Sequence, residues 1–175
     1  MTERSYNVLF VCTGNSARSI MAESILNKDG TGRFRAFSAG SRPTSIVHPL
    51  ALKVLKSFDC PTEGLRSKSW DEFARAKAPV VDFVITLCDD AARETCPEWS
   101  GQPMRAHWGI EDPAAVEGLE MLKEAAFVAA FHHLENRIAI FTEVMRKNLD
   151  NMTLGTKLRE IGQIAGATAR SRSAM

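Results

Sequence analysis

The chain has 175 residues, 45% of them hydrophobic and 25% charged, and its formal net charge is +1. These values are ordinary for one soluble globular domain, and the near-zero charge argues against nucleic acid or an anionic membrane surface as a partner. No run reaches the roughly 18 apolar residues of a membrane span, and the polar start MTERSYN argues against a secretory signal. The four cysteines are therefore expected to be reduced thiols in the cytoplasm, not a disulfide framework.

Short apolar runs alternate with segments of helical periodicity along most of the chain. Strand patterns occupy residues 7–11, 34–40, 82–87 and 103–108, and the first is a continuous branched run typical of a buried parallel strand. Apolar side chains recur at helical spacing after residue 18, after residue 48 and over about 118–149, and the pair Ser69 and Glu72 is typical of a capping box. Strands that alternate with helices predict a single α/β domain with a mostly parallel sheet.

The predicted domain spans residues 1–150, and residues 151–175 form a C-terminal extension. In this extension TLGTKLREIGQIAG has the pattern of one short helix. The last residues, ATARSRSAM, are small and polar, so we expect a disordered tail.

The stretch VCTGNSARS combines a nucleophile with the features of an anion site. Cys12 ends the first predicted strand, and Arg18 opens the following helix. Small residues between them let backbone N–H groups surround an anion, and the helix dipole and the guanidinium add positive charge. The same field is expected to lower the pKa of the Cys12 thiol. Ser19 can donate a hydrogen bond to the thiolate, and Asn15 tolerates a left-handed backbone and can bond to its own backbone.

The same stretch resembles the phosphate-binding loop of the low-molecular-weight protein tyrosine phosphatase superfamily. The resemblance implies a four-stranded parallel sheet in the order 2-1-3-4, flanked by helices. Phosphatases and arsenate reductases share the loop, so the loop alone does not distinguish the two activities. With Cys12 as the nucleophile, the predicted substrate-binding residues are Thr13, Gly14, Asn15, Ser16, Ala17, Arg18 and Ser19.

A second segment, TLCDDAARETCP, resembles the thioredoxin-coupled arsenate reductases of this superfamily. With FVITL before it and HWGIEDP after it, the resemblance runs from about residue 6 to 145. It implies that Cys88 attacks Cys12 and that Cys96 resolves the disulfide. A helix over the segment would hold the Cα atoms of Cys88 and Cys96 about 12 Å apart, so the segment must unwind or loop before the two can join. The alternative is a core cysteine and a loop cysteine.

The pair Asp112 and Pro113 resembles the general acid of the superfamily. Asp112 can equally be a helix N-cap with proline at the first helical position. A phosphatase of this fold usually carries tyrosine just after the pair, whereas this chain has Ala114 and Ala115, and Tyr6 is its only tyrosine. Bare arsenate needs no aromatic partner, so this loop favours the reductase.

Some of these reductases bind a potassium ion beneath the loop. Asn15, Glu23 and Ser38 match that site, but Lys68 replaces an aspartate of it. The ammonium group of a lysine can take the place of the cation, so we predict no metal site.

The remaining histidines and the fourth cysteine carry no motif. His107 is interpreted as strand-end packing, His132 and His133 as a solvated or partly buried helix pair, and Cys60 as structural. None of the histidines lies at zinc-ligand spacing around a cysteine.

These observations predict an arsenate reductase that uses Cys12, Arg18, Cys88, Cys96 and Asp112. We expect a monomer without a bound cofactor, regenerated by an external thiol reductant: thioredoxin, or alternatively glutathione with glutaredoxin. A phosphatase that acts on small phosphomonoesters would need only Cys12, Arg18 and Asp112. A non-catalytic oxyanion-binding or redox-sensing module is the third possibility.

Overall fold

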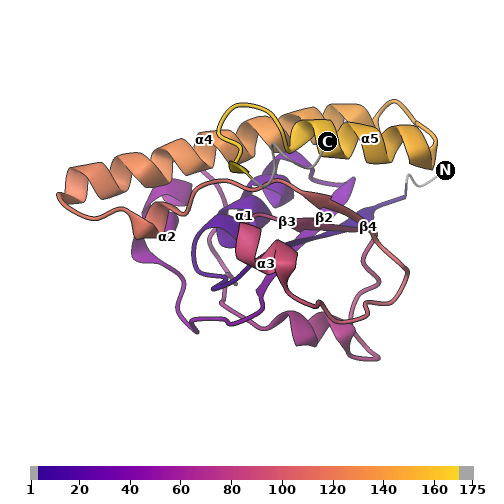
Figure 1. Ribbon diagram of the computed structural model, residues 1–175, viewed down its shortest axis with the longest axis horizontal. Coiled ribbons are helices and arrows are strands. Elements are labelled where there is room, and N and C mark those ends of the chain that lie inside the picture. The colour runs from indigo at the N-terminus through magenta and orange to yellow at the C-terminus, as the bar shows by residue number, and fades with distance from the viewer. Residues whose placement is uncertain (1–3, 170–175) are drawn as a thin grey trace.

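The computed structural model describes residues 4–169, and a parallel β-sheet forms its centre (Figure 1). Its strands are β1 (Tyr6–Cys12), β2 (Phe34–Gly40), β3 (Phe83–Thr86) and β4 (Met104–His107). They lie in the order β2-β1-β3-β4, and each adjacent pair is parallel. The predicted single α/β domain and its strand order are confirmed. The carboxyl ends of all four strands meet at one edge of the sheet, where ligands bind in such folds.

The helices are α1 (Arg18–Asp29), α2 (Pro49–Ser57), α3 (Asp89–Arg93), α4 (Glu120–Met145) and α5 (Asn151–Ile161), with short 3₁₀ helices η1 (Trp70–Ala74) and η2 (Pro113–Ala115). Buried side chains of α1, α2, α4 and α5 form the larger hydrophobic core with one face of the sheet. The opposite face packs against η1, α3 and the loop that follows α3. Figure 1 shows α4 and α5 lying side by side along one side of the molecule.

Strand β1 shows why its sequence is continuously apolar. Val8 and Phe10 belong to the larger core, whereas Leu9 and Val11 belong to the smaller one. Successive side chains of a strand point to opposite faces, and both faces of this sheet are covered. Each residue of the run is therefore buried.

The predicted capping box forms only in part. The Ser69 hydroxyl accepts a hydrogen bond from the backbone N–H of Asp71, as an N-cap does. The Glu72 carboxylate does not return a bond to Ser69 but pairs with the Arg66 guanidinium at 2.7 and 3.0 Å. The resulting helix, Trp70–Ala74, is a short 3₁₀ segment, and only one of the two reciprocal bonds of a capping box is present.

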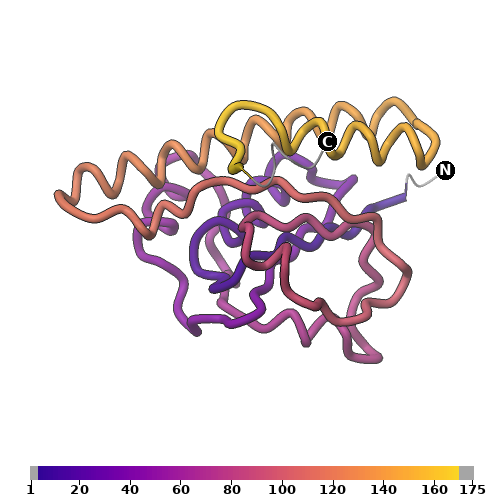
Figure 2. Tube along the Cα trace, viewed as in Figure 1, coloured from indigo at the N-terminus to yellow at the C-terminus, as the bar shows by residue number. Residues whose placement is uncertain are grey.

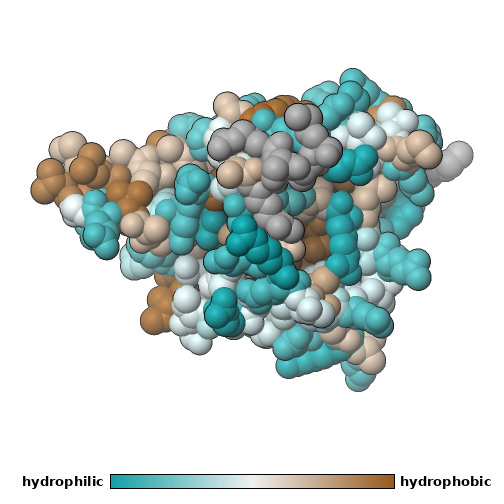
Figure 3. All heavy atoms as spheres, in the orientation of Figure 1, coloured by the Kyte–Doolittle hydropathy of each residue, from teal (hydrophilic) through white to brown (hydrophobic). Residues whose placement is uncertain are grey.

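The start of α4 extends beyond the body of the molecule. Its first turn exposes Leu119, Met121 and Leu122, and hydrophobic side chains gather at this end of the surface in Figure 3. Within residues 4–169 no helix, α4 included, combines the length and apolar composition needed to cross a membrane.

The extension after residue 150 packs onto the sheet layers. The Asp150 side chain caps α5, and Leu154, Leu158 and Ile161 enter the larger core. After α5 the chain forms a loop next to α4 (Figure 2). Thr168 is buried and bonded, so the predicted disordered tail is wrong for Ala167 and Thr168, and residues 170–175 lie outside the described chain.

Candidate active site

The loop between β1 and α1 is held from outside by its carbonyl oxygens. The carbonyls of Thr13, Gly14 and Ser16 accept hydrogen bonds from the N–H groups of residues 42, 44 and 48, at 2.9–3.0 Å. Among the described residues, no protein acceptor pairs with the N–H groups of residues 14–17. These donors and the uncapped N-terminus of α1 are available to an anion.

Asn15 fixes the turn of this loop. Its backbone has φ of +46°, which confirms the left-handed conformation expected for this asparagine. Its amide bonds to distant groups and not to its own backbone: Nδ2 donates to Ser19 Oγ at 2.8 Å, and Oδ1 accepts from the Lys68 N–H at 2.9 Å. Glycine is required at Gly40, because a Cβ there would overlap the Thr13 carbonyl.

Cys12 lies beneath the loop with its sulfur 2.8 Å from Ser19 Oγ. The Ser19 oxygen already accepts from Asn15, so its own hydrogen is free to be donated to the sulfur. Burial raises the pKa of the Cys12 thiol, against the lowering effects of Ser19 and of the Arg18 charge. The sequence prediction of a lowered pKa is therefore wrong, because it counted the positive field but not desolvation.

Arg18 crosses the mouth of the site toward the loop that precedes η2. Its guanidinium donates to the Ile110 carbonyl at 2.9 Å and lies 3.6 Å from the Asp112 carboxylate. The Asp112 side chain also accepts from the N–H of Ala114, so it is the N-cap of η2 as well as a carboxylate facing the site. The two roles left open by the sequence are compatible in one geometry.

Cys88 opens into the same cavity as Cys12. The cavity has a volume of about 580 Å³, and residues 12–18, Cys88 and Asp112 line it, whereas the predicted substrate-binding residue Ser19 is buried behind the loop. The Cys88 sulfur lies 3.2 Å from Thr13 Oγ1 and accepts from the N–H of Ala91 at 3.3 Å, so it caps α3. Two thiols thus face one anion site.

Cys96 lies outside this cavity. It lines a neighbouring cavity of about 310 Å³ on the far side of α3, with Trp99 and Arg105. Arg105 donates to the Cys96 sulfur at 2.6 Å and stacks over the Trp99 ring. The structure therefore brings Cys12, Arg18, Cys88 and Asp112 together and leaves Cys96 apart.

The residues that match the potassium site form a polar cluster under the loop. Ser38 Oγ donates to Glu23 at 2.7 Å, and the Lys68 ammonium lies 4.0 Å from the same carboxylate oxygen and donates to the Arg66 carbonyl. Burial raises the pKa of Glu23 and lowers the pKa of Lys68. The cation that faces Glu23 in this cluster is thus the side chain of Lys68.

The sequence reasoning missed a polar group at the cavity rim. His107 Nε2 lies 2.9 Å from Asp89 Oδ1, and the Thr168 hydroxyl donates to the same oxygen at 2.7 Å. His107 was interpreted as packing and Thr168 as part of a disordered tail. The only sequence signal was the position of His107 at a strand end, beside the predicted site.

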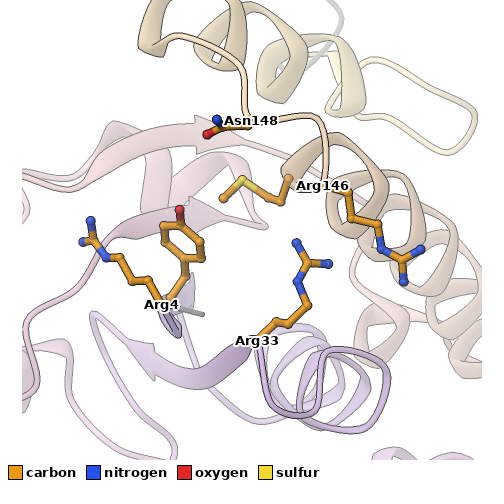
Figure 4. Close-up of a pocket in the computed structure, with 6 residues that line it drawn as sticks. Arg4, Arg33, Arg146 and Asn148 are labelled. Atoms are coloured by element: carbon orange, nitrogen blue, oxygen red, sulfur yellow. The ribbon is translucent and has the colours of Figure 1, made fainter. Parts of the chain in front are cut away.

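Other clusters offer no comparable chemistry. A cavity of about 500 Å³ lies at the opposite, amino end of the strands, where Arg4, Arg33 and Arg146 surround an open space (Figure 4). Arg4 pairs with Asp82 and Arg146 with Glu143, and none of the described residues that line this cavity is a cysteine, serine, threonine, histidine or carboxylate. Over residues 4–169 no group of three or more His, Cys, Asp or Glu side chains is arranged to hold a metal ion.

A phosphatase-type parallel sheet that carries a cysteine beneath an anion loop defines an enzyme that uses a thiol to act on oxyanions. The chain belongs to the low molecular weight phosphotyrosine protein phosphatase family, whose sequence model matches residues 7–151.

Relatives within this family carry both activities. The chain is 35% identical to an arsenate reductase of Oceanobacillus iheyensis over 78% of this chain and 94% of that protein. Its structure resembles a thioredoxin-dependent arsenate reductase of Corynebacterium glutamicum, with a TM-score of 0.62 and 25% identity over 85% of this chain and 66% of that chain. It also resembles a low molecular weight protein tyrosine phosphatase of T. tengcongensis, with a TM-score of 0.63 and 25% identity over 82% and 99% of the two chains. The fold alone does not choose between the activities.

Proposed function

We propose that this protein reduces arsenate to arsenite through a relay of three cysteines. Cys12 is the nucleophile, the N–H groups of residues 13–18 and the Arg18 guanidinium hold the oxyanion, and Asp112 protonates the departing oxygen. Cys88 and Cys96 carry the oxidising equivalents away from the site.

The proposed reaction begins with a substitution at arsenic. The Cys12 sulfur replaces one oxygen of arsenate, which leaves as water, and arsenic remains As(V). The Cys88 thiolate then attacks the Cys12 sulfur. The S–As bond breaks, its electron pair passes to arsenic, and arsenite leaves as a disulfide forms between Cys12 and Cys88. Cys96 attacks Cys88, which frees the Cys12 thiolate, and an external dithiol reduces the Cys88–Cys96 disulfide.

The raised pKa of Cys12 fits substitution on a dianion. A protonated thiol avoids a buried negative charge on Cys12 before the substrate binds. When the arsenate dianion binds, the thiol proton can pass to an arsenate oxygen. The loop then never holds a thiolate and a dianion at the same time.

The observation that carries the proposal is the second thiol in the anion cavity. Hydrolysis of a phosphate ester needs water at the Cys12 adduct, whereas reduction needs another thiol, and Cys88 lies in the same cavity. None of the described residues that line the cavity is aromatic, so a phosphotyrosyl ring would find no stacking partner. Both features favour a small inorganic oxyanion as the substrate.

Thioredoxin is the reductant that we propose. The relay ends in an internal disulfide, which a dithiol protein can reduce directly, and one structural relative is described as thioredoxin-dependent. Glutathione with glutaredoxin remains the alternative, and a cytoplasmic location fits an enzyme that needs reduced thiols.

An assay of NADPH oxidation tests the proposal. Arsenate is supplied with thioredoxin and thioredoxin reductase, in parallel with a glutathione–glutaredoxin system and with nitrophenyl phosphate. We expect arsenate-dependent NADPH oxidation with thioredoxin and only weak ester hydrolysis. Rapid hydrolysis of the ester without arsenite in either reducing system would instead assign the phosphatase activity, which needs only Cys12, Arg18 and Asp112.

A further inference from the structure

We propose that residues 162–168, the C-terminal clasp, position Cys88 for its attack on Cys12 by holding Asp89. The inference rests on the proposed function, because it concerns the first disulfide exchange. The clasp lies beyond residues 7–151, which match the family. In this inference Thr168 and His107 are positioning residues.

The Asp89 carboxylate is fixed by two donors at one oxygen. Thr168 Oγ1 donates to Oδ1 at 2.7 Å, and His107 Nε2 lies 2.9 Å from the same atom. The other ring nitrogen of His107 lies 2.7 Å from Thr86 Oγ1, which ties the imidazole to β3. Burial favours the neutral acid, but the hydrogen bonds from Thr168 and His107 outweigh it and lower the pKa of Asp89. The carboxylate therefore accepts both bonds as an anion at neutral pH.

The clasp reaches this carboxylate through a close backbone approach at Gly109. The Thr168 N–H donates to the Gly109 carbonyl at 3.0 Å, and Ala167 forms an antiparallel bridge with Ile110. A Cβ at Gly109 would overlap Thr168 Oγ1 and would lie 2.8 Å from Asp89 Oδ1. The absence of a side chain at residue 109 lets the three polar groups meet.

A buried arginine of α4 holds the clasp from the other side. Arg137 is fully buried and donates to the carbonyls of Ala165 at 3.2 Å and Ile164 at 3.4 Å. Burial lowers the pKa of its guanidinium to about 10, so it is still charged at neutral pH. A buried charge bonded to the clasp makes displacement of the clasp costly, because displacement would leave donors of a charged group unpaired.

The consequence falls on the next residue in the chain, Cys88. Asp89 is the first residue of α3, and the Cys88 sulfur lies at the α3 N-terminus against Thr13. Asp89 is bonded to His107, which is tied to β3, and to Thr168 of the clasp. These bonds hold the Cys88 backbone while the rest of the segment up to Cys96 reorganises. Attack on a sulfur demands close alignment, and a misplacement of about 1 Å can slow a reaction about 100-fold.

Thr168→Val removes the hydroxyl while keeping the shape, and Thr168→Ser restores it. Both are made in a Cys96→Ser background, in which no Cys96 thiol can attack Cys88, so the Cys12–Cys88 disulfide accumulates. The reduced proteins are mixed with arsenate, quenched over time, and the disulfide is measured by mass spectrometry. Thr142→Val is the matched control, because the Thr142 hydroxyl donates to the Ala139 carbonyl of its own helix, away from the clasp.

We expect Thr168→Val to slow formation of the Cys12–Cys88 disulfide about 10-fold, with a much smaller change in the arsenate concentration for half-maximal rate. Thr168→Ser and Thr142→Val should stay within about 2-fold of the parent. Amide hydrogen exchange of the reduced proteins should show faster exchange in residues 89–93 of Thr168→Val alone, which gives a second measurement if the variant is poorly stable. An equal rate and equal exchange in Thr168→Val would overturn the positioning role. If the parent itself forms no Cys12–Cys88 disulfide, the proposed relay fails, and the clasp has no exchange to position.

Discussion

The anion loop, residues 12–19, and the relay segment, residues 88–96, differ in how the fold holds them. In the loop Cys12, Asn15 and Ser19 are buried, and hydrogen bonds to its backbone or side chains come from residues 42, 44, 48, 67 and 68. The relay segment contains one helix of five residues, and its last cysteine is only partly buried and bonded to a side chain.

This difference corresponds to two kinds of chemistry. Binding and substitution at an oxyanion need donors that are already in place before the substrate arrives. In the proposed relay, transfer of a disulfide from Cys88 to Cys96 needs a segment that can change shape, because Cys96 lines a different cavity from Cys12. The proposal therefore requires a rigid part, the anion loop, and an adaptable part, the relay segment, that meet at Cys88.

Cys12→Ser should have the largest effect, because it removes the nucleophile of the anion loop. A serine hydroxyl is far less acidic and less nucleophilic than a thiol, so both arsenate reduction and ester hydrolysis should fall by about 10⁴-fold or more. The NADPH-coupled assay and nitrophenyl phosphate hydrolysis measure the two activities, and circular dichroism checks the fold. Substantial turnover by the folded variant would remove Cys12 from the nucleophile role.

Cys88→Ser should distinguish the two activities, because only arsenate reduction needs the relay segment. Arsenate reduction should fall by about 10³-fold, because no second thiol faces the adduct, whereas weak ester hydrolysis should stay within about 3-fold of wild type. Cys60→Ser is the control, since Cys60 is buried in the opposite core and bonds only weakly to the Phe58 carbonyl. Equal loss of both activities in Cys88→Ser would indicate a structural role and favour the phosphatase.

Asp112→Asn should slow the chemistry at the anion loop without changing the local structure. The amide can still accept from the Ala114 N–H and cap η2, but it cannot donate a proton to the departing oxygen. We expect about a 100-fold loss in the rate of the first substitution, in the range for removal of a general acid. The loss should shrink for an ester whose leaving group needs no protonation, and a uniform loss for all leaving groups would contradict the acid role.

Lys68→Met should loosen the support under the loop. Removing one partner of a buried ion pair leaves the Glu23 carboxylate without its nearest cation. Because both side chains keep some contact with solvent, we expect unfolding to become easier by about 2 kcal/mol, less than for a fully buried pair. Urea unfolding measures this change. Adding Glu23→Gln should recover most of the loss, and failure to recover would mean that the lysine contributes by packing.

The smallest expected effect is a shift in the pH dependence of Cys12 alkylation. This shift reports the direction in which the loop moves the pKa of the thiol. Burial raises the pKa of the Cys12 thiol, so the midpoint of the rise in its alkylation rate with iodoacetamide should lie above about pH 8.5, the midpoint for an ordinary thiol. Peptide mass spectrometry separates Cys12 from the other three cysteines. A plateau below pH 7 would restore the lowered pKa that the sequence suggested.

The sequence by itself determined the strands, the loop and the two nearest thiols. Residues 34–40 were predicted as a strand with the bounds that β2 has, and the order of the sheet followed from the resemblance. These features are local: the apolar period of a strand, and a cysteine, small residues and an arginine at fixed spacing, are set by neighbours in the chain. Cys88 was placed at the end of a predicted strand, and its role followed from the resemblance of TLCDDAARETCP to the arsenate reductases.

Only the tertiary structure decided which distant groups complete the site. Asn15 bonds to residue 68, and Asp89 meets Thr168, 79 residues away, through hydrogen bonds that no periodicity encodes. The direction of the Cys12 pKa likewise depends on burial by side chains from several elements. Such contacts depend on the path of the whole chain, because a hydrogen bond forms between groups that the fold brings within about 3 Å, whatever their separation in sequence.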